Sequence, residues 1–218
     1  MATLLSIGEF LRENPLTILL SFPVLGLAVI IYYFSENRPD LAGALGHLAL
    51  TFRLFYKHHL KIKLLLLISY QLLAESAKIG TGDGQPTVRM VMGGISAELG
   101  SLDQAQKDYE KGINMAHGLD DKNQAAYIES HLGKLFIQKG EYQKALKHLD
   151  TAYKVLSEFA KGQTDPRPHI WLSNVELGYS DYYLAMRDRA QAKKWADHAS
   201  DRAQKYKLET RKQDVKKQ

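Results

Sequence analysis

The segments MGGISAELGSLDQAQKDYEKGINMA (residues 92–116) and LGKLFIQKGEYQKALKHLDTAYKVL (residues 132–156) are two copies of one pattern. Glycine at 100 and 140 separates two stretches of helical character in each copy, and glycine readily adopts the backbone conformation that ends a helix. Each copy is therefore expected to form a pair of helices joined by a tight turn. Two such pairs in sequence favour an all-α fold in which the helix pairs stack on one another.

Small residues recur at matching positions in the two copies, and their spacing predicts how the helices pack. Gly93 and Gly133 lie in the middle of the first helix, where a small side chain lets a partner helix approach. Larger side chains at the point where the two helices of a pair cross would push them apart. The sequence therefore predicts helix-packing positions at Gly93, Gly100, Ala105, Tyr109, Gly112, Gly133, Gly140, Ala145, Leu149 and Ala152.

A third, degenerate copy runs from about residue 173 to 205. Ser180, Tyr183, Ala192 and Ala199 take the corresponding positions, and Arg187 stands where the other copies have the turn glycine. The step from Ala105 to Ala145 is 40 residues and the step from Ala145 to Ala192 is 47. We interpret the longer step as the insertion of a loop rich in helix breakers, GQTDPRP at residues 162–168.

This pattern resembles the tetratricopeptide repeat (TPR) family over residues 87–205. The residues that carry the resemblance most clearly are Leu132, Gly133, Phe136, Gly140, Tyr142, Ala145 and Ala152. The resemblance implies an α-solenoid of helix pairs whose first helices line a concave face that binds a peptide or partner protein. By that rule the expected partner contacts are Arg89, Ser96, Glu129, Lys134, Gln138 and Asn174. A plain bundle of helical hairpins is the alternative fold.

The N-terminal part contains the uncharged stretch PLTILLSFPVLGLAVIIYYFS at residues 15–35. A helix needs roughly 20 apolar residues to cross a bilayer, so we expect a transmembrane helix here. Residues 1–14 form a short lead-in whose two acids, Glu9 and Glu13, outnumber its one base, Arg12. That charge pattern is unlike a cleaved signal peptide. A buried core helix is the alternative for residues 15–35.

Residues 36–79 are expected to form a pair of apolar helices, at 41–56 and 60–75, and the breakers at 80–86 predict a loop. These helices are expected to pack on each other and on the next repeat. In a second interpretation one of them lies in the membrane interface, with Lys57, Lys61 and Lys63 reaching lipid headgroups. Residues 206–218 read as a basic C-terminal tail.

Composition and motifs argue against several functional classes. The chain has 218 residues, a net charge of +5 and no cysteine, which leaves no disulfide or thiolate metal site. Its basic residues are dispersed, so no nucleic-acid partner is expected. No zinc-protease, phosphate-loop or nucleophile-elbow motif is present, and the His58–His59 pair has no carboxylate at zinc spacing. The adjacent acids Asp120 and Asp121 are expected to have a structural role instead, which is to begin a helix at 122–138. We therefore expect no enzyme, no metal, no cofactor and no small-molecule substrate.

The order of an N-terminal anchor, two apolar helices and about three repeats resembles single-pass mitochondrial TPR proteins. These include the adaptor of the inner-membrane i-AAA protease and the TPR factor that maintains respiratory complex III. The resemblance implies an adaptor, assembly factor or accessory subunit at the mitochondrial inner membrane. Two alternatives stay open: a cytosol-facing import or trafficking receptor on the outer mitochondrial or endoplasmic-reticulum membrane, and a structural subunit of a large membrane complex.

Overall fold

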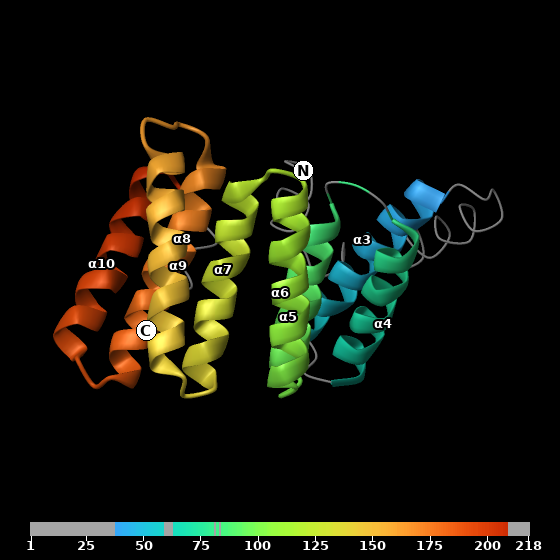
Figure 1. Ribbon diagram of the computed structural model, residues 1–218, viewed down its shortest axis with the longest axis horizontal. Coiled ribbons are helices and arrows are strands. Elements are labelled where there is room, and N and C mark those ends of the chain that lie inside the picture. The colour runs from blue at the N-terminus through green and yellow to red at the C-terminus, as the bar shows by residue number, and fades with distance from the viewer. Residues whose placement is uncertain (1–37, 59–62, 81, 83, 209–218) are drawn as a thin grey trace. The chain divides into compact units, whose positions relative to one another are not determined.

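The computed structural model describes residues 38–58, 63–80, 82 and 84–208, and this part of the chain is entirely helical outside its turns (Figure 1). The all-α prediction is therefore confirmed. The predicted lead-in at 1–14, the predicted anchor at 15–35 and residues 209–218 of the tail lie outside the described residues. The helices are α3 (Arg38–His58), α4 (Lys63–Ile79), α5 (Gln85–Glu98), α6 (Leu102–Gly118), α7 (Lys122–Gln138), α8 (Tyr142–Ala160), α9 (Pro166–Ala185) and α10 (Arg189–Lys205).

The chain divides into two compact units, and the boundary falls within α6. The N-terminal unit ends at Ala105 and the C-terminal unit begins at Gln106. Across the described residues of both units, no helix combines the length and the apolar character that crossing a membrane requires.

In the N-terminal unit α3 and α4 form an antiparallel pair. Two serines of α4 bond the backbone of α3: Ser69 Oγ donates to the Ala49 carbonyl and Ser76 Oγ to the Ala42 carbonyl, each at 2.7 Å. These short side chains hold the two backbones close together. Helix α5 packs on α4, and the core is built from Leu66, Leu73, Met92 and Ile95, none of which is more than 2 % exposed. The expected packing of the two apolar helices on each other and on the next element is thus seen.

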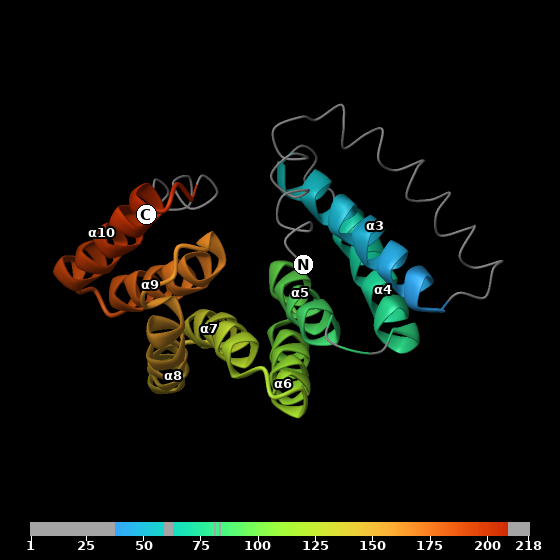
Figure 2. The same ribbon diagram turned by 90° about the horizontal axis from the view of Figure 1, so that it is seen from above.

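In the C-terminal unit α7 pairs with α8 and α9 pairs with α10, and α9 also packs against both α7 and α8 (Figure 2). Leu149, Leu156 and Val175 are fully buried between these helices. Helix α9 is enclosed on almost every side, because each residue from 172 to 180 is buried.

Aspartates begin three of the helices. Asp121 Oδ1 accepts a bond from the Gln124 amide at 2.9 Å, Asp165 from the Arg167 amide at 2.8 Å and Asp188 from the Gln191 amide at 3.0 Å. These bonds satisfy amides that have no partner within the first helical turn. Asp121 therefore begins the helix at 122–138, as its sequence position predicts.

The turns that end α5, α7 and α9 share a left-handed residue. Gly100 has φ +85°, Gly140 has φ +75° and Arg187 has φ +62°. The alignment of Arg187 with the two turn glycines therefore corresponds to a shared backbone conformation. Arg187 adopts it with a side chain, at an energetic cost that glycine avoids.

Helix α9 begins earlier than the sequence suggests. The GQTDPRP segment is interpreted above as a loop through residue 168, whereas the helix begins at Pro166. Proline is compatible with the first turn of a helix, because the amide it lacks would have no partner there. The two prolines of this segment therefore lie at the start of α9, and the third copy begins before residue 173.

Candidate partner-binding surface

Helices α7 and α9 are the first helices of their pairs, and they lie side by side in the C-terminal unit (Figure 2). Asn174 Nδ2 of α9 donates to Ser130 Oγ of α7 at 2.8 Å. Further along both helices, Lys134 Nζ lies 3.6 Å from Asp181 Oδ2. Both contacts advance in the same chain direction, so the two helices run parallel.

The ion pair lies on a surface that we call the α7–α9 face, defined by Lys134, Gln138, Asp181 and Leu184. Gln138 is four residues after Lys134 and Leu184 is three after Asp181, and such spacings place side chains on one helix face. Gln138 is exposed, and Leu184 is 44 % exposed although it is apolar. The surface thus combines a cation, an anion, an amide and an apolar side chain, a mixture suited to a polypeptide ligand.

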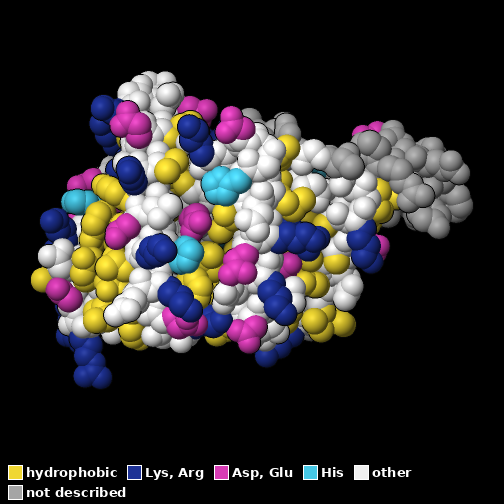
Figure 3. Space-filling model, in the orientation of Figure 1, with side chains coloured by type: hydrophobic (Ala, Val, Ile, Leu, Met, Phe, Trp, Pro, Cys, Tyr) yellow, Lys and Arg dark blue, Asp and Glu magenta, His cyan; other side chains and the backbone are white. Residues whose placement is uncertain are grey.

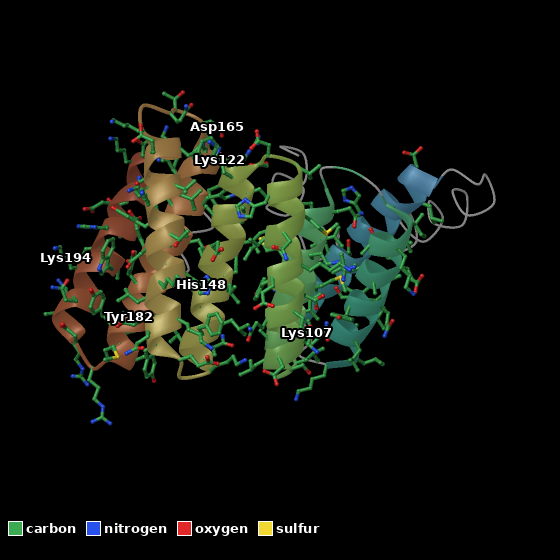
Figure 4. The ribbon with its side chains drawn as sticks, in the orientation of Figure 1. Lys107, Lys122, His148, Asp165, Tyr182 and Lys194 are labelled. Atoms are coloured by element: carbon green, nitrogen blue, oxygen red, sulfur yellow. The ribbon has the colours of Figure 1, made fainter. Side chains whose placement is uncertain are left out.

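The six expected partner contacts occupy different environments. Lys134 and Gln138 lie on the α7–α9 face. Asn174 is 3 % exposed and its amide is bonded inside the α7–α9 contact. Glu129 faces α8, where its carboxylate contacts His148 Nδ1, and His148 is labelled in Figure 4. This burial removes Asn174 from the candidate surface, and the contact with α8 removes Glu129.

The other two expected contacts lie in the N-terminal unit, on α5. Ser96 is 2 % exposed and therefore out of reach of a ligand. Arg89 is half-buried, and its guanidinium lies 3.9 Å from Met92 Sδ. The first helix of each pair buries one of its faces against neighbouring helices. The expectation that first helices contact the partner does not say which face is exposed, and it therefore selects buried residues as well as surface residues.

The expected packing residues lie in helix contacts or turns. Gly93 and Tyr109 are buried, and Ala105, Ala145, Ala152 and Ala192 are at most 2 % exposed. A Cβ at Gly133 would lie 3.0 Å from Leu149 Cγ and 3.2 Å from the Ala145 carbonyl oxygen. The small residue at 133 is therefore what lets α8 approach α7.

An aromatic cluster that the sequence did not single out joins α8, α9 and α10. Tyr179 stacks on Trp195 with ring centroids 4.4 Å apart, and Tyr153 meets both rings edge to face. The Tyr179 hydroxyl donates to Asp150 Oδ1 at 2.6 Å, and burial, together with this carboxylate, raises the pKa of Tyr179. The phenol therefore stays protonated and keeps its bond to α8.

A buried ion pair at the α9–α10 contact was also missed. Glu176 is 1 % exposed, and its carboxylate accepts bonds from Arg202 Nε at 3.0 Å and Arg202 Nη2 at 2.7 Å. The available indication was a glutamate between the apolar residues Val175 and Leu177 of α9, because a buried charge needs a partner. The pair fixes α10 against α9 and stays inside the unit.

The described residues offer little for metal chemistry. They contain no group of three histidine, aspartate or glutamate side chains placed to hold a metal ion. On the face drawn in Figure 3, basic and acidic side chains are interspersed. A mixed surface of this kind favours a protein ligand over a polyanion.

No protein-family model matches the sequence, and no curated protein sequence matches it. Solved structures do match. BtubC from P. vanneervenii is 15 % identical with a TM-score of 0.61, covering 89 % of this chain and 84 % of its own. A kinesin-light-chain-type protein of Podosopora anserina with nearly identical TPR-like repeats is 11 % identical with a TM-score of 0.67, covering 93 % of this chain and 94 % of its own.

A third similar structure is the Rap conjugation gene regulator of plasmid pLS20 in complex with the Phr* peptide. It is 17 % identical with a TM-score of 0.54, and the match covers 92 % of this chain and 58 % of the regulator. At these identities the likeness concerns the fold. The fold that the resemblance to TPR proteins implies is therefore confirmed, because the described residues fold as TPR-like helical repeats.

Proposed function

We propose that this protein is a protein-binding adaptor or accessory subunit that uses the α7–α9 face to dock a polypeptide. The observation that carries the proposal is a pair of parallel first helices, along which Gln138 and Leu184 are exposed beside the half-buried ion pair of Lys134 and Asp181. The similar Rap regulator, whose structure contains a peptide, supports a polypeptide as the ligand class. Among residues 106–208, the described part of the C-terminal unit, no group requires catalysis to explain its position.

The proposal includes a membrane anchor at residues 15–35, supported by the length and apolar character of that stretch. Tethering raises the effective concentration of the repeats near partners in the same membrane, so a modest affinity suffices. We place the protein at the mitochondrial inner membrane, as an adaptor, assembly factor or accessory subunit of a respiratory or protease complex. The support is the order of anchor, apolar helix pair and repeats along the chain.

The test is a pull-down of the full chain, carrying a C-terminal tag, from membranes in mild detergent, followed by mass spectrometry. One variant exchanges the ion pair on the α7–α9 face, Lys134→Asp with Asp181→Lys. This exchange keeps an attraction between the helices but reverses the charge pattern seen by a ligand. The matched control exchanges Lys193 and Asp197, an exposed pair on α10 at 3.5 Å.

We expect a stoichiometric membrane-complex partner with the wild type and the control, and at least a tenfold lower recovery with the α7–α9 exchange. Equal recovery with both exchanges would remove the α7–α9 face from the proposal. Recovery of cytosolic chaperones and precursor proteins, with digestion of the repeats by protease added to intact organelles, would assign the protein to the receptor class.

A further inference from the structure

Two leucines at the start of α4 are exposed to solvent. Leu64 is 58 % exposed and Leu67 is 50 % exposed, more than any other large apolar side chain among the described residues. They are three positions apart, so they lie next to each other on one face of the helix. Adjacent exposed leucines form an apolar patch, and patches of this kind mark contacts with membranes or with other proteins.

The apolar patch is confined to the first two turns of α4. Further along the same helix face are Gln71, Glu75 and Lys78, which are exposed and polar, and the last two form an ion pair at 2.7 Å. Because α4 runs antiparallel to α3 and lies beside it (Figure 2), its start lies near the end of α3. The patch is therefore at the opposite end of the helix pair from Arg38, where α3 begins.

The sequence around this patch is basic. The stretch from residue 41 to residue 74 contains no aspartate or glutamate, and its arginine and lysine residues are Arg53, Lys57, Lys61 and Lys63. Arg53 is ion-paired with Glu98 of α5 at 2.6 Å, so its charge is compensated inside the unit. The three lysines are close in sequence to the exposed leucines, and Lys63 is itself exposed. Cationic and apolar side chains thus occur together at one end of the helix pair.

This combination matches the surface of an anionic bilayer. Apolar side chains enter the boundary between headgroups and acyl chains, and lysines beside them are attracted to anionic headgroups. The position of the helix pair in the chain favours lipid over a protein as the occupant. The proposed anchor at 15–35 ends three residues before Arg38, so the bilayer is the surface to which this helix pair is tethered.

We propose that the start of α4 is a binding site for anionic lipid, with Leu64 and Leu67 inserted at the headgroup boundary and Lys63 among the headgroups. This inference rests on the proposed function, because it assumes the anchor at 15–35. Helix α3 has 21 residues and is therefore about 30 Å long. Because the anchor joins one end of α3 and the lipid-binding patch lies at the other, α3 lies along the bilayer instead of pointing away from it.

A second contact with the bilayer restricts the orientation of the N-terminal unit. A tether through residue 35 alone fixes the distance of that unit from the membrane but leaves its rotation free. The competing occupant of the patch is a protein surface, including a second copy of the chain, and the test below separates it from lipid.

The experiment uses the full chain in vesicles of phosphatidylcholine and phosphatidylserine that contain a nitroxide-labelled lipid as quencher. The chain has no cysteine, so one introduced cysteine can carry an environment-sensitive fluorophore. The fluorophore is attached at Leu67→Cys, and Leu119→Cys is the matched control, because Leu119 is a 42 % exposed leucine of the other unit. Neither side chain is part of a core, so labelling leaves the fold intact. Flotation of the vesicles first establishes that the chain is bound to them.

We expect the lipid nitroxide to quench the fluorophore at position 67 at least threefold more than at position 119. Lys61→Glu with Lys63→Glu should lower the quenching at position 67 at least twofold, because anionic headgroups then repel this end of the helix pair. Vesicles of phosphatidylcholine alone should have the same effect. The matched charge reversal, Lys193→Glu with Lys194→Glu at exposed positions of α10, should leave the quenching unchanged.

Equal quenching at positions 67 and 119, or equal effects of the two charge reversals, would overturn the proposal. A blue-shifted emission at position 67 without quenching by the lipid nitroxide would also overturn it and assign the patch to a protein surface. A chain that does not float with the vesicles would contradict the anchor of the proposed function together with this inference. Flotation without quenching at position 67 would contradict the lipid contact of α4 alone.

Discussion

The position that a Cβ would occupy on Gly178 lies 2.7 Å from Cδ2 of Leu149, closer than real Cβ atoms come to a neighbour. Leu149 of α8 is fully buried and also packs over Gly133 of α7, where the corresponding distance is 3.1 Å. One side chain of a second helix thus fills the space left by glycines on two successive first helices. This arrangement joins consecutive repeats in the C-terminal unit.

Gly178→Ala should therefore destabilise the C-terminal unit by about 1–3 kcal/mol, the usual effect of forcing a methyl group into a packed core. Leu149→Val in the same chain should recover part of that loss, because it removes the Cδ2 atom that the new methyl group meets. The free energy of unfolding is measured by urea titration followed by tryptophan fluorescence. Both tryptophans of the chain, Trp171 and Trp195, lie in this unit.

Gly118→Ala is the control for this pair of variants, since its Cβ would meet nothing within 4 Å. It should be neutral or slightly stabilising, in line with the higher helix propensity of alanine. An equal effect of alanine at 118 and 178 would mean that backbone freedom, and not contact with Leu149, determines the loss.

At the turn residue Arg187, in contrast, a substitution is expected to increase the free energy of unfolding. A side chain at φ +62° strains the backbone, and glycine at Gly140 in the preceding repeat avoids that strain. Arg187→Gly should stabilise the C-terminal unit by about 1 kcal/mol, and Gly140→Ala should destabilise it by a similar amount. Urea titration of both variants tests this, and a destabilising effect of Arg187→Gly would show that the arginine side chain contributes more than the strain costs.

The sequence predicted the repeat region well because its information is local. Turn glycines, the Asp121 cap and small residues at helix crossings act through neighbouring backbone, so their spacing alone places the helices. The unanticipated features depend on contacts between distant residues. Lys134 and Asp181 are 47 positions apart, and Glu176 and Arg202 are 26 positions apart. The start of α9 was misplaced because proline was interpreted as a breaker, although it is compatible with a first helical turn.

Substitutions of Glu176 and Arg202 should have non-additive effects on the free energy of unfolding. Glu176→Gln leaves the Arg202 guanidinium without its counter-charge, and removing one partner of a buried ion pair costs about 3–5 kcal/mol. Because the Arg202 side chain is 22 % exposed, we expect the lower end of that range. Replacing both, Glu176→Leu with Arg202→Met, should cost much less, since no charge is then left unpaired. A double-mutant cycle, from urea titrations of Glu176→Leu, Arg202→Met and the double variant, measures the coupling, and additive effects of the two single substitutions would contradict it.

The neighbouring His169 is 1 % exposed and lies between a hydrogen-bond acceptor, the Gln163 carbonyl, and a hydrogen-bond donor, the Arg202 guanidinium. Its Nε2 lies 2.9 Å from the Gln163 carbonyl oxygen, and its Nδ1 lies 3.4 Å from Arg202 Nη1. The neutral ring with hydrogen on Nε2 satisfies both, donating to the carbonyl and accepting from the guanidinium. Burial, together with the positive charges of Arg202 and Lys205, lowers the pKa of His169, although Asp165 and the Gln163 carbonyl act in the opposite direction.

In the unfolded chain this histidine has a pKa of about 6.5. Below that pH the unfolded state binds a proton that the folded state resists, so the free energy of unfolding of the C-terminal unit should fall as the pH drops from 7.5 to 5.5. His169→Gln removes the titration but keeps a donor for the Gln163 carbonyl. The variant should therefore show a shallower pH dependence in urea titrations followed by tryptophan fluorescence, a probe that reports only this unit.

His117→Gln, at an exposed position of α6, is the matched control. A slope reduced equally by both substitutions would show that His169 has no special part in it, whereas a reduction confined to His169→Gln would assign the acid sensitivity of this unit to the ring beside Arg202.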